Sequence, residues 1–285
     1  MGKRGLTVGY IFCDKEFKED EKAFIKVAKK KKINLIFFNI AKEISEDEVE
    51  ERAKQCDIIF NNSAEEFAIE FVKTLEELGK KVIEPSEKYY RSDDKWLFFL
   101  KCKENKVPTP ETILLSENIV IAEKELKEFG RWPVVLKRIE GCTGEYVERA
   151  ENIKEAVKIL EKFWANGERL PVIAQEFIKS KSYRVTLIDD KIVQTATKDN
   201  TGWKSTGVYQ KKHHKFKVDK NLKKICEKIT KASGINVCGV DLMNDNGIWK
   251  VIEVNSQPAF DFFPNEREML IGKVLDLLIK KARKK

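Results

Sequence analysis

Three side chains with the chemistry of metal ligands lie close together near the C-terminal end of the chain. Residues 239–258 read GVDLMNDNGIWKVIEVNSQP, in which two apolar runs flank the turn-forming cluster NDNG. This pattern predicts a β-hairpin. Asp241 lies in the first run, whereas Glu253 and Asn255 lie in the second. Because Glu253 and Asn255 are two residues apart, their side chains would share one face of a strand.

Whether Asp241 joins that face depends on the loop of the hairpin. A three-residue loop at 245–247, with Gly247 left-handed, would pair Asp241 with Val251 and bring it to the face of the other two polar residues. A two-residue loop at Asn246 and Gly247 would turn Asp241 to the opposite face. We expect the three-residue loop, and with it a cluster of three oxygen-bearing side chains.

Such a cluster suits magnesium, a hard cation that proteins usually hold with one or two carboxylates while phosphates fill other positions. The alternative is that the three residues form the polar outer face of an amphipathic hairpin. The spacing of Asp241, Glu253 and Asn255 alone leaves both interpretations open.

Two lysines upstream could supply ammonium groups to phosphate oxygens. Lys95 lies in the first turn of an expected helix at 92–105, and Lys137 ends the apolar strand PVVLK. A turn follows Lys137, and its Gly141 and Gly144 could aim backbone N–H groups at the same phosphates. Taken singly, each lysine is better explained as a surface residue of a lysine-rich chain.

The next candidate segment lies where a strand passes into a loop, at Gln175, Glu176, Phe177 and Ile178. Its backbone could bind an adenine edge while its last two residues form apolar walls; an ordinary edge strand is the alternative. Arg184, on the following strand, could bind the terminal phosphate through two nitrogens. Lys198, which leaves the strand after that, could do likewise.

The order of these pieces resembles the RimK-type branch of the ATP-grasp superfamily. Lys95 precedes VPTPET, and PVVLK, a glycine-containing turn, QEFI, Arg184, Asp241 and EVN follow in that order. This branch includes glutamate and amino-acid ligases that act on carboxylates of proteins, peptides or cofactors. The resemblance covers nearly the whole chain. It implies an ATP-grasp fold, in which two lobes with an antiparallel sheet each clasp ATP.

The resemblance also implies a role for each candidate residue. Lys95 and Lys137 would bind phosphates beneath the turn 141–144, and residues 175–178 would line the adenine. The implied ligands of two magnesium ions, with manganese as an alternative ion, are Asp241, Glu253 and Asn255. The implied catalytic residues at the transferred phosphate are Arg184 and Lys198.

Three features depart from the family pattern. Glu145 and Tyr146 stand in the turn where small residues are expected. Residues 203–212 read WKSTGVYQKK in place of Arg-x-Asn followed by Arg-Gly-Gly, and Gln257 is unusual after EVNS. Because the region 203–212 normally helps to hold the acceptor and the acyl phosphate, the resemblance does not identify the substrate.

Composition sets the class of protein. The chain has 285 residues, 42% of them hydrophobic, which is enough for one large domain or a few small ones. Its formal charge of +8 comes from lysines scattered beside glutamates, so we expect a solvated surface and no nucleic-acid partner. The six cysteines lack paired spacing, and neither a signal peptide nor a membrane-length apolar run is present. We expect a cytoplasmic protein with reduced thiols and no membrane partner.

The predicted fold class is mixed, α/β followed by α+β. Strands alternate with helices at the N-terminal end, which predicts a small parallel sheet covered on both faces. We expect an N-terminal α/β domain at 1–88, a central lobe at 89–170, and a C-terminal lobe at 171–285 that carries the metal site.

The functional hypothesis is an ATP-dependent carboxylate–amine ligase that forms an amide through an acyl phosphate. Its partners would be a small-molecule, peptide or protein carboxylate and an amine such as glutamate. One alternative is an ATP-grasp kinase acting on a polyol phosphate, with the basic run 211–215 binding substrate. Another is a nucleotide-binding module without catalysis. The resemblance suggests a homodimer or homotetramer.

Overall fold

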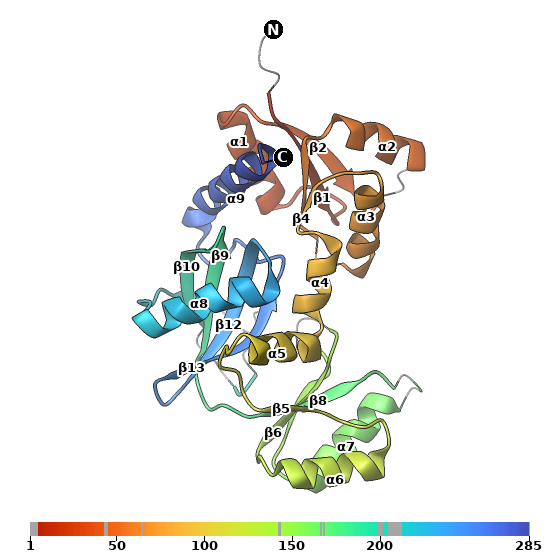
Figure 1. Cartoon of the computed structure of the whole chain (residues 1–285), viewed down its shortest axis with the longest axis vertical. Helices are drawn as coiled ribbons and strands as arrows, with labels where there is room; N and C mark the ends of the chain where they lie inside the picture. The colour runs from red at the N-terminus through yellow and green to blue at the C-terminus, as the bar shows by residue number, and fades with distance from the viewer. Residues whose placement is uncertain are drawn as a thin grey trace.

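The computed structural model describes residues 5–42, 45–63, 65–141, 144–165, 167, 169–198, 202–204 and 213–284, without the side chains of Tyr90, Arg91 and Lys198. Three sheets follow one another along the molecule (Figure 1). The N-terminal sheet lies at one end, the sheet of the C-terminal half lies in the middle, and the sheet of the central segment lies at the other end.

The N-terminal sheet is parallel, as the alternation of strands and helices predicts, and has the order β2-β1-β3-β4. Its strands are β1 (Thr7–Phe12), β2 (Asn34–Asn39), β3 (Ile58–Asn61) and β4 (Val82–Ile83), and its helices are α1 (Glu19–Lys30), α2 (Glu46–Gln55) and α3 (Glu66–Glu77). Strands β2 and β3 pair with opposite edges of β1, so the order of strands reverses direction at β1. The carboxyl ends of β1 and β3 therefore lie at a topological switch point, where open α/β sheets bind ligands.

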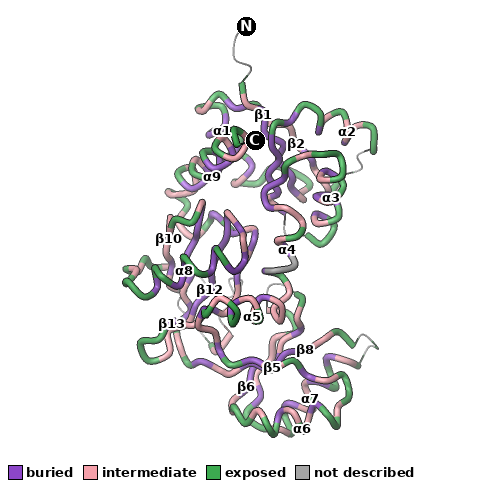
Figure 2. The backbone as a smooth tube through the Cα atoms, in the orientation of Figure 1, coloured by how far each residue is buried: buried purple, intermediate pink, exposed green. Residues whose placement is uncertain are grey.

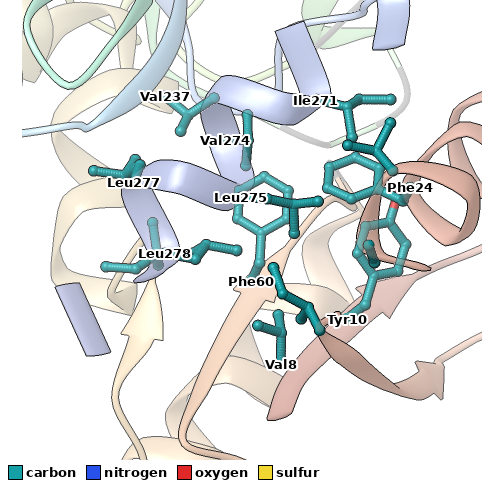
Figure 3. Packing of buried hydrophobic residues seen from close by; sticks show 14 of the residues in the cluster. Val8, Tyr10, Phe24, Phe60, Val237, Ile271, Val274, Leu275, Leu277 and Leu278 are labelled. Carbon is teal, nitrogen blue, oxygen red and sulfur yellow. The ribbon is translucent and has the colours of Figure 1, made fainter. Parts of the chain in front are cut away.

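The C-terminal helix returns to this first sheet. Helix α9 (Arg267–Ala282) packs beside α1, and its Ile271, Leu275 and Leu278 share one core with Tyr10 and Phe24 (Figure 3). Sequence alone placed this helix with the C-terminal lobe. An amphipathic pattern predicts an apolar face but does not specify which surface covers it.

The central sheet is antiparallel with the order β5-β8-β6-β7. Its strands are β5 (Thr112–Leu114), β6 (Val134–Arg138), β7 (Val147–Ala150) and β8 (Val172–Glu176), and α6 (Ile119–Phe129) and α7 (Ile153–Trp164) cover one face. Leu136 of β6 packs into this core, so the next residue, Lys137, points to the uncovered face.

The third sheet is antiparallel with the order β11-β10-β9-β12-β13. Its strands are β9 (Ser182–Ile188), β10 (Lys191–Lys198), β11 (His213–His214), β12 (Val237–Asp245) and β13 (Ile248–Asn255). Helices α5 (Lys95–Glu104) and α8 (Lys220–Ser233) pack on one face of it. Strands β9 and β12 are largely buried, whereas the outer surfaces of α6 and α7 are exposed (Figure 2).

One predicted helix is two helices in the structure. The expected helix at 92–105 breaks at Asp94, between α4 (Ser86–Asp93) and α5. The Asp94 backbone is extended, and its carboxylate accepts a hydrogen bond from Leu97 N at 2.8 Å. Aspartate is a preferred N-cap, and this cap places Lys95 in the first turn of α5.

The expected division after residue 170 comes before β8, which pairs with β5 and β6 of the central sheet. A division that followed the sheets would fall between Glu176 and Ser182. The three-domain organisation itself stays a prediction. Among the described residues, no helix has the length and apolarity needed to cross a membrane.

Candidate functional site at the β12–β13 hairpin

The hairpin forms where the sequence predicts it, but its loop and register differ from the prediction. Asp245 pairs with Ile248, so the loop has two residues, and both Asn246 (φ 50°) and Gly247 (φ 92°) are left-handed. Val251 pairs with Leu242, not with Asp241. The expected three-residue loop is therefore wrong.

Asp241 nevertheless reaches the face of the other two polar residues, because β13 contains an extra residue. The register shifts between Leu242–Val251 and Asp241–Glu253, which leaves Ile252 as a β-bulge. Val251 and Val254, three residues apart, both point into the core, whereas Glu253 is only partly buried. The bulge thus reverses the alternation of faces and sets Asp241 directly opposite Glu253.

Asp241 also faces a cation across the other neighbouring strand. Arg184 of β9 is its pairing partner there. Arg184 Nε lies 2.7 Å from Asp241 Oδ1, and Nη2 lies 2.6 Å from Oδ2. Both residues are buried. Asn255 completes the group, since its Nδ2 lies 3.3 Å from Asp241 Oδ2.

The chemistry of this donor set fits magnesium. Asp241, Glu253 and Asn255 converge as two carboxylates and an amide, and a guanidinium already occupies the cation side of Asp241. The described part of the chain contains no group of three or more His, Cys, Asp or Glu residues arranged for a metal. A hard cation here would need phosphate oxygens to complete its coordination, as magnesium sites commonly do.

Lys137 is electrostatically connected to the same carboxylates. It is partly buried, and its Nζ donates to Gln175 Oε1 at 2.7 Å. Burial lowers the pKa of Lys137 to about 8, an effect that Lys95 strengthens and that Glu253 and Asp241 oppose. Because the ammonium is paired with a neutral amide, an anionic ligand would be a better partner than the one it has.

Lys95 is anchored to the turn that follows Lys137. Its backbone N–H donates to Ile139 O at 3.0 Å, and its Nζ lies 2.9 Å from Gly141 O. Gly141 (φ 123°) and Gly144 (φ 78°) have backbone conformations that favour glycine. The two residues between these glycines lie outside the described residues. The role of the turn 141–144 in phosphate binding therefore stays a prediction.

Tyr146, which departs from the family pattern, has a structural explanation. Its backbone is left-handed (φ 51°), its ring lies 3.5 Å beneath the Arg138 guanidinium, and it packs edge-on against Phe163. The ring therefore fastens the end of the turn to the central sheet.

The predicted adenine-binding segment lies at the end of β8. Glu176 N donates to Glu111 O at 2.8 Å, and Phe177 N donates to Pro133 O at 3.4 Å. These two N–H groups thus have protein partners. Ile178 is buried, and the Phe177 ring lies 4.2 Å from the Arg149 guanidinium. Lys198 ends β10, where it pairs with Ser182, but its side chain lies outside the described structure.

Sequence reasoning missed two carboxylates that support the site. Asp93 Oδ1 lies 3.1 Å from Ser92 Oγ, and desolvation, aided by Glu253, raises the pKa of Asp93. Glu84 accepts hydrogen bonds from Asn236 N, Asn236 Nδ2 and Val237 N at 2.7 to 2.9 Å, and so fixes the start of β12 to the N-terminal sheet. The only sequence signal for Asp93 was its place as the first acid of SDDK, and Glu84 had no sequence signal.

A cavity of about 1060 Å³ opens at the switch point of the N-terminal sheet. It is lined from the β1 end by Phe12 and Asp14, from the β3 end by Asn62 and Ser63, and from the segment after β13 by Asp261 and Arg267. Ala259, also in the lining, is four residues after Asn255, a separation that spans at most about 14 Å. The edge of the cavity at Ala259 therefore lies within that distance of Asn255, one of the predicted metal ligands.

Comparisons with known proteins agree with this geometry. A family model described as a RimK-like ATP-grasp domain matches residues 92–276. A probable alpha-L-glutamate ligase of Shewanella loihica is 27% identical over 222 residues, which are 74% of this chain and 71% of that protein. The tetrahydromethanopterin:alpha-L-glutamate ligase of Methanocaldococcus jannaschii is 29% identical over 208 residues, 70% of each chain.

The fold has a close counterpart among solved structures. D-alanine–D-alanine ligase from Bacillus anthracis, complexed with ATP, superposes with a TM-score of 0.74 at 18% identity and covers 98% of this chain and 97% of its own. At that identity the likeness concerns the fold, which is the ATP-grasp fold. The hairpin, both lysines and the predicted adenine-binding segment all fall within the matched range 92–276. The chain belongs to the RimK-like ATP-grasp family.

Proposed function

We propose that this protein is an ATP-dependent carboxylate–amine ligase that forms an amide through an acyl phosphate. The observation that carries the proposal is the convergence of Asp241, Glu253 and Asn255 on one face, within electrostatic reach of Lys137. The named relatives, both of which are alpha-L-glutamate ligases, favour glutamate as the amine. The carboxylate partner would be a small molecule, a peptide or a protein.

The proposed reaction has two steps. A carboxylate oxygen attacks the terminal phosphorus of ATP, the bond from that phosphorus to the bridging oxygen breaks, and ADP leaves. The amine nitrogen then attacks the acyl carbon and loses a proton, and phosphate departs with the oxygen that came from the carboxylate. Positioning and charge stabilisation supply most of the rate enhancement in phosphoryl transfer, so no acid–base pair is needed in the first step.

The residues of this chain divide that work by position. Asp241, Glu253 and Asn255 would hold two magnesium ions, or manganese in their place, which neutralise charge on the phosphate oxygens. Lys137 and Lys95 would bind the same phosphates from the central lobe, and Gln175 orients Lys137 through its hydrogen bond. Arg184 would stabilise the transferred phosphoryl group, and we assign Lys198 the same role.

The cavity at the N-terminal sheet is the proposed substrate pocket. Its volume of about 1060 Å³ exceeds that of a typical small-molecule site, and polar groups from three separate segments line it. The five described cysteines are free, which supports a cytoplasmic enzyme. We propose a homodimer or homotetramer as the assembly.

The test measures ADP release from magnesium and ATP with L-glutamate and a panel of carboxylates, including tetrahydromethanopterin and glutamate-terminated peptides. The proposal predicts ADP only when amine and carboxylate are both present, and a product lighter than their sum by one water. Glu253→Gln should abolish the signal, whereas Asp276→Asn, on the surface of α9, should not. ADP formed without an amine, together with a phosphorylated product, would instead identify a kinase.

A further inference from the structure

The proposed metal ligand Asp241 is already bound by a cation that belongs to the chain. Arg184 contacts both carboxylate oxygens, at 2.7 and 2.6 Å, and the two residues are only 8% and 7% exposed. Charge-assisted bidentate pairs of this kind are among the strongest hydrogen-bonded contacts in proteins. The guanidinium thus occupies one lone-pair side of each Asp241 oxygen, and a metal that binds on that side must displace it.

The backbone around this pair leaves room for the guanidinium. Arg184 and Asp241 are register partners on β9 and β12, and Gly239 lies two residues before Asp241 on the same face. A Cβ at Gly239 would lie 2.1 Å from Arg184 Nη1. The missing side chain of Gly239 is thus the space that the guanidinium fills.

While Arg184 is paired with Asp241, the positive and negative charges of the site balance. Asp241, Glu253 and the neighbouring Asp93 supply three negative charges, and Arg184, Lys137 and Lys95 supply three positive charges. A divalent cation that arrived alone would leave the site with excess positive charge in a partly desolvated environment, which is unfavourable. A cation that arrives with nucleotide phosphates brings its own negative charge, and those phosphates also offer the guanidinium a new partner.

We propose that Arg184 holds the cation position of the metal site until nucleotide arrives, and that metal and guanidinium then exchange at Asp241. The inference rests on the metal assignment of the proposed function and adds an order to it, in which the metal enters with the nucleotide. Arg184, released from Asp241, becomes free to contact the phosphates only after the metal has replaced it. Arg184 therefore neutralises the Asp241 carboxylate first and acts at the phosphate afterwards.

The test measures Mn²⁺ binding to the nucleotide-free protein from the electron paramagnetic resonance signal of free Mn²⁺. Arg184→Met should bind Mn²⁺ at least about tenfold more tightly than the wild type, since coupling between close buried charges is commonly of that size or larger. Gly239→Ala keeps every charge but takes the space of Nη1, and it should also bind Mn²⁺ more tightly. Arg131→Met is the matched control, because Arg131 makes a bidentate pair with Glu111 on the surface, and it should match the wild type.

A second control separates exchange from a general charge effect. Lys137→Met also removes one positive charge near the carboxylates but breaks no pair with Asp241, so its effect should be clearly smaller than that of Arg184→Met. Equal Mn²⁺ affinity in Arg184→Met and the wild type, or equal gains in Arg184→Met and Lys137→Met, would overturn the exchange. Thermal melting of each variant confirms that it is folded.

The failure of the metal assignment has a different signature. With a non-hydrolysable ATP analogue present, the wild type should bind Mn²⁺ tightly and Asp241→Asn should not. If Asp241→Asn binds Mn²⁺ as the wild type does under these conditions, Asp241 is not a ligand and the proposed site is wrong. If that experiment succeeds while the nucleotide-free affinities are unchanged by Arg184→Met, only the exchange is wrong.

Discussion

Asp241 and Glu253 lie directly opposite each other on neighbouring strands because one residue of β13, Ile252, is an extra residue in the pairing. Without the bulge, Glu253 would share a face with Val251, which is fully buried in the core. The bulge lets Val254 return to the core while Glu253 and Asn255 turn to the other face. A single residue thus decides whether the two carboxylates can act on one ligand.

The first prediction concerns those carboxylates. Asp241→Asn and Glu253→Gln should each lower the rate of ADP formation by at least about a hundredfold, the scale seen when one group that stabilises transition-state charge is removed. Urea unfolding should show that Glu253→Gln remains folded. Asp276→Asn serves as the control, since Asp276 pairs with Lys31 on the surface. Near-normal turnover in Glu253→Gln would remove that residue from the site.

The second prediction concerns Lys137, whose pKa burial lowers to about 8. Between pH 8 and 10.5 the unfolded chain binds more protons than the folded one. The free energy of unfolding should therefore rise with pH in this window, by up to roughly 3 kcal/mol for this residue. An anionic ligand favours the charged lysine, so ATP binding above pH 8 should take up a proton.

Calorimetry in buffers of different ionisation enthalpy measures that uptake. It should vanish in Lys137→Met and persist in Lys101→Met, where the lysine pairs with Glu104 on the outer face of α5. Proton uptake at pH 8.5 that is the same in Lys137→Met and the wild type would show that Lys137 does not bind the phosphates.

The third prediction concerns Glu84, which joins the N-terminal sheet to β12. Burial raises the pKa of Glu84 to about 7, against the opposing effect of the hydrogen bonds from Asn236 and Val237. Its contribution to stability is fully present below pH 4.5 and is lost as the pH rises through 7, a change of roughly 3 kcal/mol. The difference in unfolding free energy between the wild type and Glu84→Gln should fall across this range; a difference independent of pH would contradict the prediction.

Much of the fold follows from local pattern. The parallel N-terminal sheet, the hairpin and the strand that carries Lys137 follow from the sequence because alternation and turn residues act over a few positions. The break at Asp94 and the packing of α9 on the N-terminal sheet do not. Both depend on which surfaces meet, and Figure 3 shows residues of α9 and α1 in one core although they lie more than two hundred positions apart in the chain.

The candidate site was predictable in composition but not in contacts. The residue types and their order indicated a phosphate and metal site, yet the pair of Arg184 with Asp241 depends on the register of β9 against β12. Nothing in either segment specifies that register. The hairpin loop shows the same limit, because its sequence permits both loop lengths and only the bulge at Ile252 reconciles a two-residue turn with a shared face.

The most direct test of the account follows oxygen atoms through the reaction. The carboxylate of the acceptor that supports amine-dependent ADP release is labelled with oxygen-18. The phosphate released in the reaction is then analysed by mass spectrometry. The account predicts that each amide formed transfers one labelled oxygen to phosphate, because that oxygen bonds to phosphorus in the acyl phosphate. Amide formation with unlabelled phosphate would contradict the acyl-phosphate route and the function built on it.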